Sequence, residues 1–175
     1  MTDPVFVDSN ILVYARDANE PRKQPLAAEL LRQLWRERSG RLSMQVLSEF
    51  YVTVTRKLRP PLDAPSAWRV VEAFLSWSPQ MIDRPLLQRA RHLEQQHALG
   101  WWDALIVAAA EAQACAVLLS EDLQDGATYG TVLVRNPFKP GVNQARADYR
   151  ASEPAISRHR GRGRPPGKAG RQSHR

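Results

Sequence analysis

The chain has 175 residues, a length that suits one domain with a sizeable hydrophobic core. It contains a single cysteine and no apolar run of about 18 residues, so an internal disulfide is excluded and no membrane span is expected. Its first residues lack the basic and then apolar stretches of a signal peptide, and we therefore expect a cytoplasmic location.

The formal net charge of +7 is concentrated at the C-terminal end. Residues 1–140 hold 16 Lys and Arg and 16 Asp and Glu, whereas residues 141–175 hold nine basic and two acidic residues. After Tyr149 this end has almost no large apolar side chain, so it cannot bury enough surface to offset the entropy of ordering. We expect one domain over 1–140 and a disordered basic tail over 141–175.

Short apolar runs alternate with segments of helical periodicity along the first 140 residues. In chain order we expect a strand at 4–7, helices at 11–17 and 25–38, a strand at 40–44, helices at 45–58 and 64–77, a strand at 79–83, helices at 84–99 and 102–114, a strand at 116–120, a loop at 121–130 and a strand at 131–136. Ser66 is the expected N-cap of one helix, and Gly100 is expected to close another. The alternation predicts an α/β fold with a short parallel sheet and helices on both faces.

Four acidic residues fall where such a fold brings side chains together. Asp8 and Asp122 each follow a predicted strand, Asp103 lies in the first turn of a helix, and Glu49 lies near the apolar face of another helix. Ligands bind beyond the carboxyl ends of parallel strands. Several carboxylates at one sheet edge repel one another unless a cation offsets their charge, and Mg²⁺ and Mn²⁺ prefer such oxygen ligands.

Each acid also has a structural explanation when it is taken alone. Asp8 could cap a helix, and Asp103 could stabilise the N-terminus of its helix. Asp122 and Asp125 could be turn residues, and Glu49 could face solvent. These explanations weaken when the acids are considered together, because a structural role for each does not account for their predicted convergence.

Four segments together resemble a known family. "VDSNILVYA", "LSEFYVTVTRK", "WWDALIVAAA" and "LLSEDLQDG" are similar, in order and spacing, to the motif blocks of PIN-domain ribonucleases, and most of all to VapC-like toxins of prokaryotic toxin–antitoxin pairs. The resemblance spans roughly residues 4–138. It implies a PIN-like three-layer α/β/α domain that hydrolyses RNA phosphodiester bonds with Mg²⁺ or Mn²⁺. It also implies the toxin of a type II system, restrained by a cognate antitoxin protein.

The resemblance assigns roles to individual residues. Those implied to be catalytic and to bind the metal are Asp8, Glu49, Asp103 and Asp122, with Asn10 and Ser120 as polar residues that support them and Asp125 as a residue that assists or replaces Asp122. Ser120 stands where many relatives have Thr, a change that keeps the hydroxyl group. The residues before Asp103, Trp101 and Trp102, could stack on a base or pack in the core or at its rim.

The tail lies outside this resemblance and points to a second function. "RGRGRPPGK" resembles the AT-hook, in which Arg162 and Arg164 would enter a narrow A·T minor groove of DNA. Non-specific contact with DNA or RNA and an inert solubilising tail are the other interpretations. The alternative to a ribonuclease is thus a nucleic-acid-binding module on a PIN scaffold with weak or no catalysis. The oligomeric state stays open, with a homodimer as one arrangement.

Overall fold

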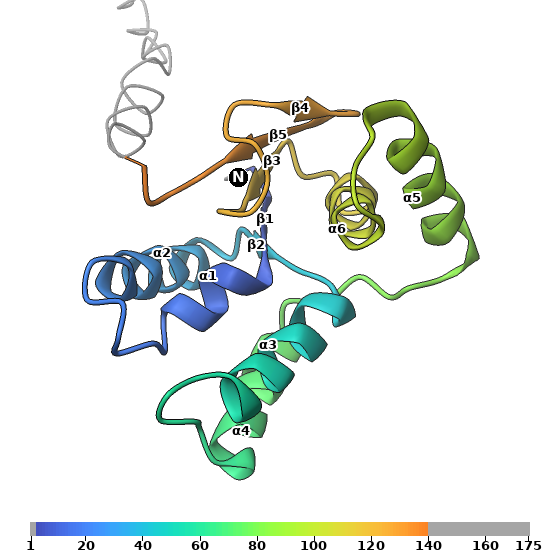
Figure 1. Ribbon diagram of the computed structural model, residues 1–175. Coiled ribbons are helices and arrows are strands. Elements are labelled where there is room, and N and C mark those ends of the chain that lie inside the picture. Colours follow the sequence, from blue (N-terminus) through green and yellow to red (C-terminus); the bar gives the residue numbers. More distant parts are fainter. Residues whose placement is uncertain (1–2, 140–175) are drawn as a thin grey trace, which may run out of the picture.

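The structure is a computed structural model that describes residues 3–139 (Figure 1). The helices are α1 (Ser9–Tyr14), α2 (Lys23–Glu37), α3 (Met44–Arg56), α4 (Ala64–Leu75), α5 (Arg84–His97) and α6 (Trp101–Ala112), and the strands are β1 (Val5–Val7), β2 (Gly40–Arg41), β3 (Val117–Leu119), β4 (Thr128–Tyr129) and β5 (Val132–Arg135). The disordered tail predicted over 141–175, including Arg162 and Arg164, lies outside the described residues.

The strands form one sheet in the order β2-β1-β3-β5-β4. The pairs β1–β2, β1–β3 and β3–β5 are parallel, and only the edge strand β4 runs antiparallel to its neighbour. The chain moves from β1 to β2 in one direction and from β2 back past β1 to β3 in the other. Because crossovers between parallel strands are right-handed, such a reversal places the connecting helices on opposite faces. The predicted α/β fold with a short, mostly parallel sheet is confirmed.

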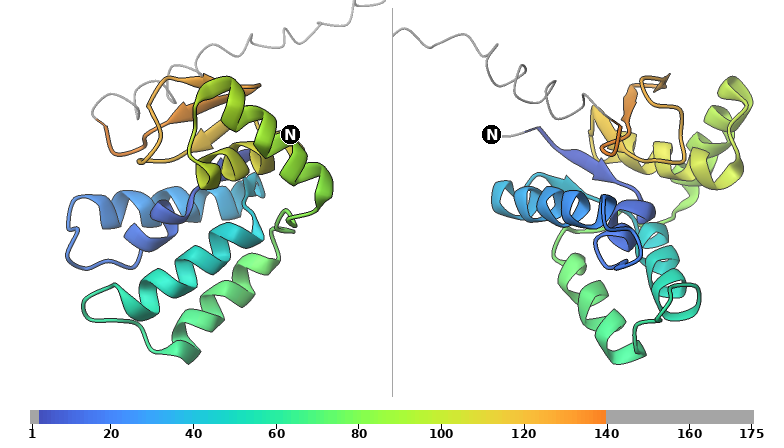
Figure 2. Two further views of the ribbon diagram at one scale, coloured as in Figure 1. Left: turned by 45° about the vertical axis from the view of Figure 1, so that its right-hand side comes forward. Right: turned by 60° about the vertical axis from the view of Figure 1, so that its left-hand side comes forward.

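Four of the described helices lie beside the sheet, and two project away from it. In Figure 1, α1 and α2 lie on one side of the strands and α5 and α6 on the other, while α3 and α4 project together as a two-helix arm. The other views in Figure 2 show the same arm extending away from the sheet. Helix α6 is the central one, because residues 104–110 are all buried. Its run of alanines allows α5 and the sheet to approach it closely.

The predicted strand at 79–83 is wrong. This segment makes only an isolated parallel bridge between Ser43 and Gln80, in which the Met44 N–H donates to the Gln80 carbonyl at 3.0 Å. A prediction from local hydrophobicity favoured a strand there, but Met81 and Ile82 are both exposed. The two-residue strand β4 was missed for the opposite reason, because its polar and glycine-rich surroundings are typical of a loop.

Two predicted helix boundaries are also wrong. The N-cap of α4 is Asp63, whose carboxylate accepts a hydrogen bond from the Ser66 N–H at 2.8 Å, so Ser66 is a capped residue and not the cap. Helix α5 ends at His97 and not at Gly100, because Ala98 adopts the left-handed conformation with φ 52°. Gly100 instead precedes α6 as its N-cap.

Candidate active site

Asp8 occupies the carboxyl end of the central strand β1. Its backbone N–H continues the β1–β3 ladder by donating to the Leu119 carbonyl at 3.0 Å, and the residue is only 4 % exposed. Oδ2 accepts hydrogen bonds from Ser120 Oγ at 2.6 Å and from Asn10 Nδ2 at 3.0 Å. Oδ1 accepts from the Ser9 N–H at 2.6 Å, so Asp8 is also the N-cap of α1. The structural and functional interpretations of Asp8 are therefore compatible.

Asn10 links Asp8 to the loop after β3. Its Nδ2 donates to Asp122 Oδ2 at 3.1 Å as well as to Asp8. Ser120 fixes this loop, because its hydroxyl donates to Asp8 and accepts from the Asp122 N–H at 3.2 Å. Asn10 Oδ1 is buried and has no hydrogen-bond partner among the described residues. A buried acceptor without a donor is costly, and it leaves one unused oxygen beside the carboxylates.

Glu49 reaches the same edge from helix α3. Its Oε2 accepts from Ser9 Oγ at 2.9 Å, and its Oε1 accepts from Gln45 Nε2 at 2.9 Å. The nearly buried Gln45 also donates to the Trp102 carbonyl at 3.2 Å, which connects Glu49 to the first turn of α6. Sequence reasoning missed both Ser9 and Gln45. The spacing of Gln45 and Glu49, one helical turn apart, is the signal that could have found Gln45.

Asp103 lies in that first turn of α6 and is partly buried. Burial raises the pKa of its carboxyl group, and the negative charges of Asp122 and Glu49 raise it further. Gln45, which donates to both Glu49 and the carbonyl of the preceding residue Trp102, holds this first turn of α6 beside Glu49. The structure thus brings together Asp8, Glu49, Asp103 and Asp122 from four separate sequence segments.

Burial is also the main cause of the raised pKa of Asp8, which is about 6 instead of 3.8. The hydrogen bonds from Ser120 and from the Ser9 backbone oppose this change, because they stabilise the carboxylate. The charges of Glu49 and Asp122 reinforce it. Without a cation, the fold therefore resists the ionised form of the carboxyl group that it places at the centre of the cluster.

This shift predicts how the metal-free protein responds to pH. Because the pKa of Asp8 is higher in the folded state, ionisation of this carboxyl group lowers the free energy of unfolding. This destabilisation is absent below pH 3.8 and fully present above about pH 6. A change of about two pKa units corresponds to about 3 kcal/mol. In chelator, the free energy of unfolding from urea titrations should fall by up to that amount between about pH 4 and pH 7. The Asp8→Asn variant should lack this component, and identical pH profiles for the two proteins would contradict the assignment.

The polar contacts of Asp125 are with residues outside the group of four acids. Its Oδ1 accepts from the Asn136 N–H at 2.9 Å, and its Oδ2 lies 3.7 Å from Lys139 Nζ. It therefore ties the loop after β3 to the segment after β5, which is a structural role. A salt bridge of Lys23 with Glu121 at 2.8 Å holds the same loop from the side of α2.

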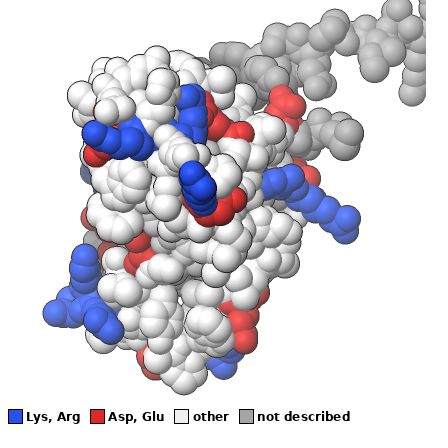
Figure 3. Space-filling model, turned by 90° about the vertical axis from the view of Figure 1, so that its right-hand side faces the viewer, with Lys and Arg blue, Asp and Glu red and all other residues white. Residues whose placement is uncertain are grey.

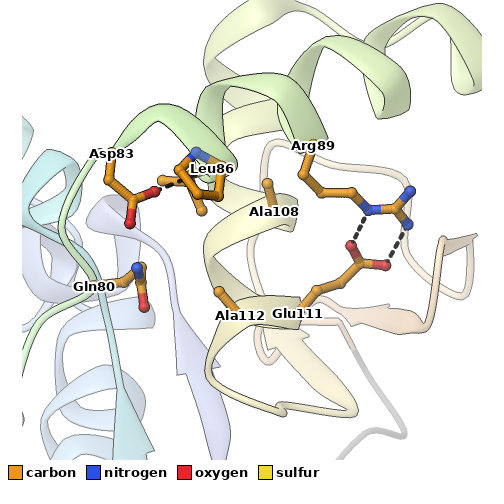
Figure 4. Close-up of a pocket in the computed structure, with 8 residues that line it drawn as sticks. Gln80, Asp83, Leu86, Arg89, Ala108, Glu111 and Ala112 are labelled. Atoms are coloured by element: carbon orange, nitrogen blue, oxygen red, sulfur yellow. Dashed lines mark hydrogen bonds and ion pairs between the residues drawn. The ribbon is translucent and has the colours of Figure 1, made fainter.

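The two described hollows lie away from the acids. One of about 480 Å³ is lined by Trp35, Arg41 and Trp77, among other residues, near the amino ends of the strands. Another, of about 360 Å³, lies between α5 and α6, and Figure 4 shows the salt bridge between Arg89 and Glu111 at its side. Arg89 Nε lies 2.6 Å from Glu111 Oε2, so the charges there are already paired. Neither hollow offers the converging, unneutralised groups found beside Asp8.

The fold and the carboxylates at its sheet edge define an α/β domain with an acidic site. Residues 5–124 match the PIN domain family, which is more than half of the chain, and the protein therefore belongs to that family. PIN domains are in general nucleases and typically use divalent metal ions. No curated protein matches the chain. None of the helices within residues 3–139 is both long and apolar enough to cross a membrane.

The side-chain atoms available as metal ligands at the site fit a divalent cation that prefers oxygen. Four carboxylates and the unpartnered Asn10 Oδ1 supply oxygen atoms only, which is the set that Mg²⁺ and Mn²⁺ favour. Within residues 3–139, however, no three or more Asp, Glu, His or Cys side chains are grouped closely enough to hold an ion. Hydrogen-bond donors contact the carboxylate oxygens instead: Ser9 and Gln45 donate to Glu49, and Asn10 donates to Asp122. A cation bound here would compete with some of these hydrogen bonds for the carboxylate oxygens.

Proposed function

We propose that the protein is a metal-dependent endoribonuclease that hydrolyses phosphodiester bonds of RNA. The observation that carries this proposal is the buried Asp8, whose pKa is raised by burial and by the neighbouring acids Glu49 and Asp122, with Asp103 in the first turn of α6 that Gln45 holds beside Glu49. A fold does not benefit from such repulsion in itself, so the arrangement calls for a cation. Family membership supports nuclease activity, and the choice of RNA rests on the resemblance to VapC-like toxins.

The residues of this chain divide the work. Asp8 and Asp103 would hold Mg²⁺ or Mn²⁺, and Glu49 and Asp122 would ligate a second ion, hold water molecules at the metal or orient the nucleophile. When bound, the metal supplies an activated water nucleophile and offsets negative charge on the reacting phosphate. Ser120 fixes the orientation of Asp8 through its 2.6 Å hydrogen bond. Such outer hydrogen bonds orient ligating carboxylates.

RNA cleavage should require a divalent cation. Purified protein incubated with labelled single-stranded RNA should cleave it with Mg²⁺ or Mn²⁺ and should lose that activity in chelator, because the cation would activate the attacking water and offset negative charge on the phosphate. Restoring an excess of Mg²⁺ over the chelator is the control and should restore the activity. Undiminished cleavage in chelator would exclude the metal mechanism.

We further propose that the protein is the toxin of a type II toxin–antitoxin pair. A nuclease that cuts cellular RNA must be restrained, and a cationic side chain of an antitoxin could pair with the acids at this edge. Expression of this chain alone should arrest growth, and co-expression of the adjacent small reading frame should restore it. An Asp8→Asn control should be harmless. Strong, harmless expression of the folded wild-type protein would contradict the toxin role.

A nucleic-acid-binding module with weak catalysis is the second candidate. The observation in its favour is the charge distribution: residues 3–139 have equal numbers of basic and acidic residues, and all net charge is in the tail. Figure 3 shows basic and acidic side chains mixed over the face that carries α5. On this alternative, the tail binds DNA or RNA and the acids contribute little.

A further inference from the structure

Trp102 differs from the other tryptophans of the chain. It is 62 % exposed, the largest value among the exposed large hydrophobic residues, whereas the preceding Trp101 packs against the hydrophobic core. Trp35 and Trp77 pair with each other, and Trp68 pairs with Tyr51 and donates to Glu72. Within residues 3–139, the Trp102 indole makes no aromatic pair or hydrogen bond. Packing therefore explains the other four rings and leaves that of Trp102 unexplained.

The backbone that carries this ring is fixed relative to the acids. Gln45 Nε2 donates both to the Trp102 carbonyl at 3.2 Å and to Glu49 Oε1 at 2.9 Å, so these two oxygens lie no more than about 6 Å apart. Asp103 is the next residue in α6. The backbone that carries the exposed indole is thus held beside Glu49 by a nearly buried amide, on a helix whose middle is fully buried.

A substrate that enters this site has little charge to attract it. The described residues sum to zero net charge, and the site itself is acidic. A nucleic acid therefore gains from a contact there that does not depend on basic side chains, and stacking of a base on an aromatic ring is such a contact. We propose that Trp102 is a specificity-determining residue that stacks on an unpaired nucleobase next to the phosphate being cleaved. This inference rests on the proposed nuclease function and names its substrate as single-stranded.

The test compares Trp102→Ala and Trp102→Phe in the full chain on a short single-stranded RNA. Loss of one stacked base should raise KM roughly 5- to 100-fold in Trp102→Ala with kcat nearly unchanged, and Trp102→Phe should recover part of the loss. In separate substrates, an abasic nucleotide is placed at each position around the cut. For the wild type, KM should rise at one of these positions. For Trp102→Ala, the abasic nucleotide at that position should cause no further rise in KM. Single-stranded DNA of the same sequence should show the same stacking, whereas duplex RNA should be insensitive to the substitution.

The controls separate this inference from a structural role and from the proposed function. Trp68→Ala removes an exposed tryptophan on α4 and should leave KM unchanged. If the wild type cleaves nothing, the proposed function fails, but fluorescence anisotropy of the same labelled oligonucleotides still measures stacking at Trp102. The inference is overturned if Trp102→Ala keeps wild-type KM and affinity, or lowers kcat alone. It is also overturned if the abasic penalty persists, or if the variant loses only the binding of an antitoxin protein.

Discussion

Asp8→Asn and Asp103→Asn should each lower RNA cleavage at saturating Mg²⁺ by at least about 100-fold, because even the removal of an outer partner of a metal ligand typically costs 10–100-fold. Asparagine keeps the size of the side chain but removes the negative charge. At position 8 it also presents an amide donor where Asp8 accepts hydrogen bonds from Ser120, Asn10 and Ser9. The measurement is the initial rate of cleavage of a labelled RNA by purified variants.

A matched substitution tests whether the effect belongs to the site. Asp63 also caps a helix through its carboxylate, but it lies on the two-helix arm and is exposed. Asp63→Asn should keep its cap, since Asn and Asp cap helices about equally, and should keep full activity. Asp125→Asn should also retain most activity, because Asp125 bonds Asn136 and Lys139 and not the cluster. Wild-type rates in both Asp8→Asn and Asp103→Asn would show that the site lies elsewhere.

The parts of the site that could be predicted are those that depend on strand ends. Asp8 and Asp122 follow apolar runs, and in a parallel sheet the carboxyl ends of β1 and β3 must meet at one edge. Glu49 could be predicted because a carboxylate near an apolar helical face needs a partner. The family resemblance then related all four acids to one another, and the structure places them around the same edge.

Contacts between elements could not be predicted in this way. Ser9 bridges Asp8 and Glu49 across 40 residues of sequence, and Gln45 reaches from α3 to the backbone of α6. Neither contact follows from local periodicity, because each depends on how two helices are placed in space. The same limit applies to Trp102: the sequence allowed both core packing and exposure for the adjacent tryptophans, and only the placement of α6 separated them.

The errors at helix ends arose where two residues within one helical turn could each cap or end the helix. Asp63 and Ser66 are both good N-cap residues, and the cap went to Asp63 because the helix starts at Ala64. Gly100 was the favoured helix end, yet Ala98 accepts the left-handed conformation that glycine adopts more easily. Such choices differ by little free energy locally, so tertiary contacts decide them.

Deletion of residues 141–175 should change nucleic-acid affinity far more than catalysis. The deletion removes nine basic and two acidic residues and leaves a chain with no net charge. For every phosphate that the tail neutralises, its removal should reduce the slope of log affinity against log salt by about 0.9 on duplex DNA and about 0.7 on single strands. If the tail neutralises about six phosphates, the affinity of the full chain for duplex DNA should fall about 10³-fold between roughly 50 and 200 mM salt, and the truncated chain should not show this fall. Cleavage of a short RNA at saturating concentration should survive, because the four acids remain.

Substitution of Arg162 and Arg164 by Ala in the full chain distinguishes the interpretations of the tail. An AT-hook requires both side chains in a narrow minor groove, so the double variant should lose its preference for A·T-rich duplex while G·C-rich binding changes little. Equal losses on both duplexes would leave non-specific attraction alone, and no loss on either would make these arginines dispensable.

For the deletion of residues 141–175, circular dichroism of the truncated protein is the folding control. A truncated protein that is folded but inactive at saturating RNA would contradict a catalytic site confined to residues 1–140 and would favour a role of the tail in the reaction itself.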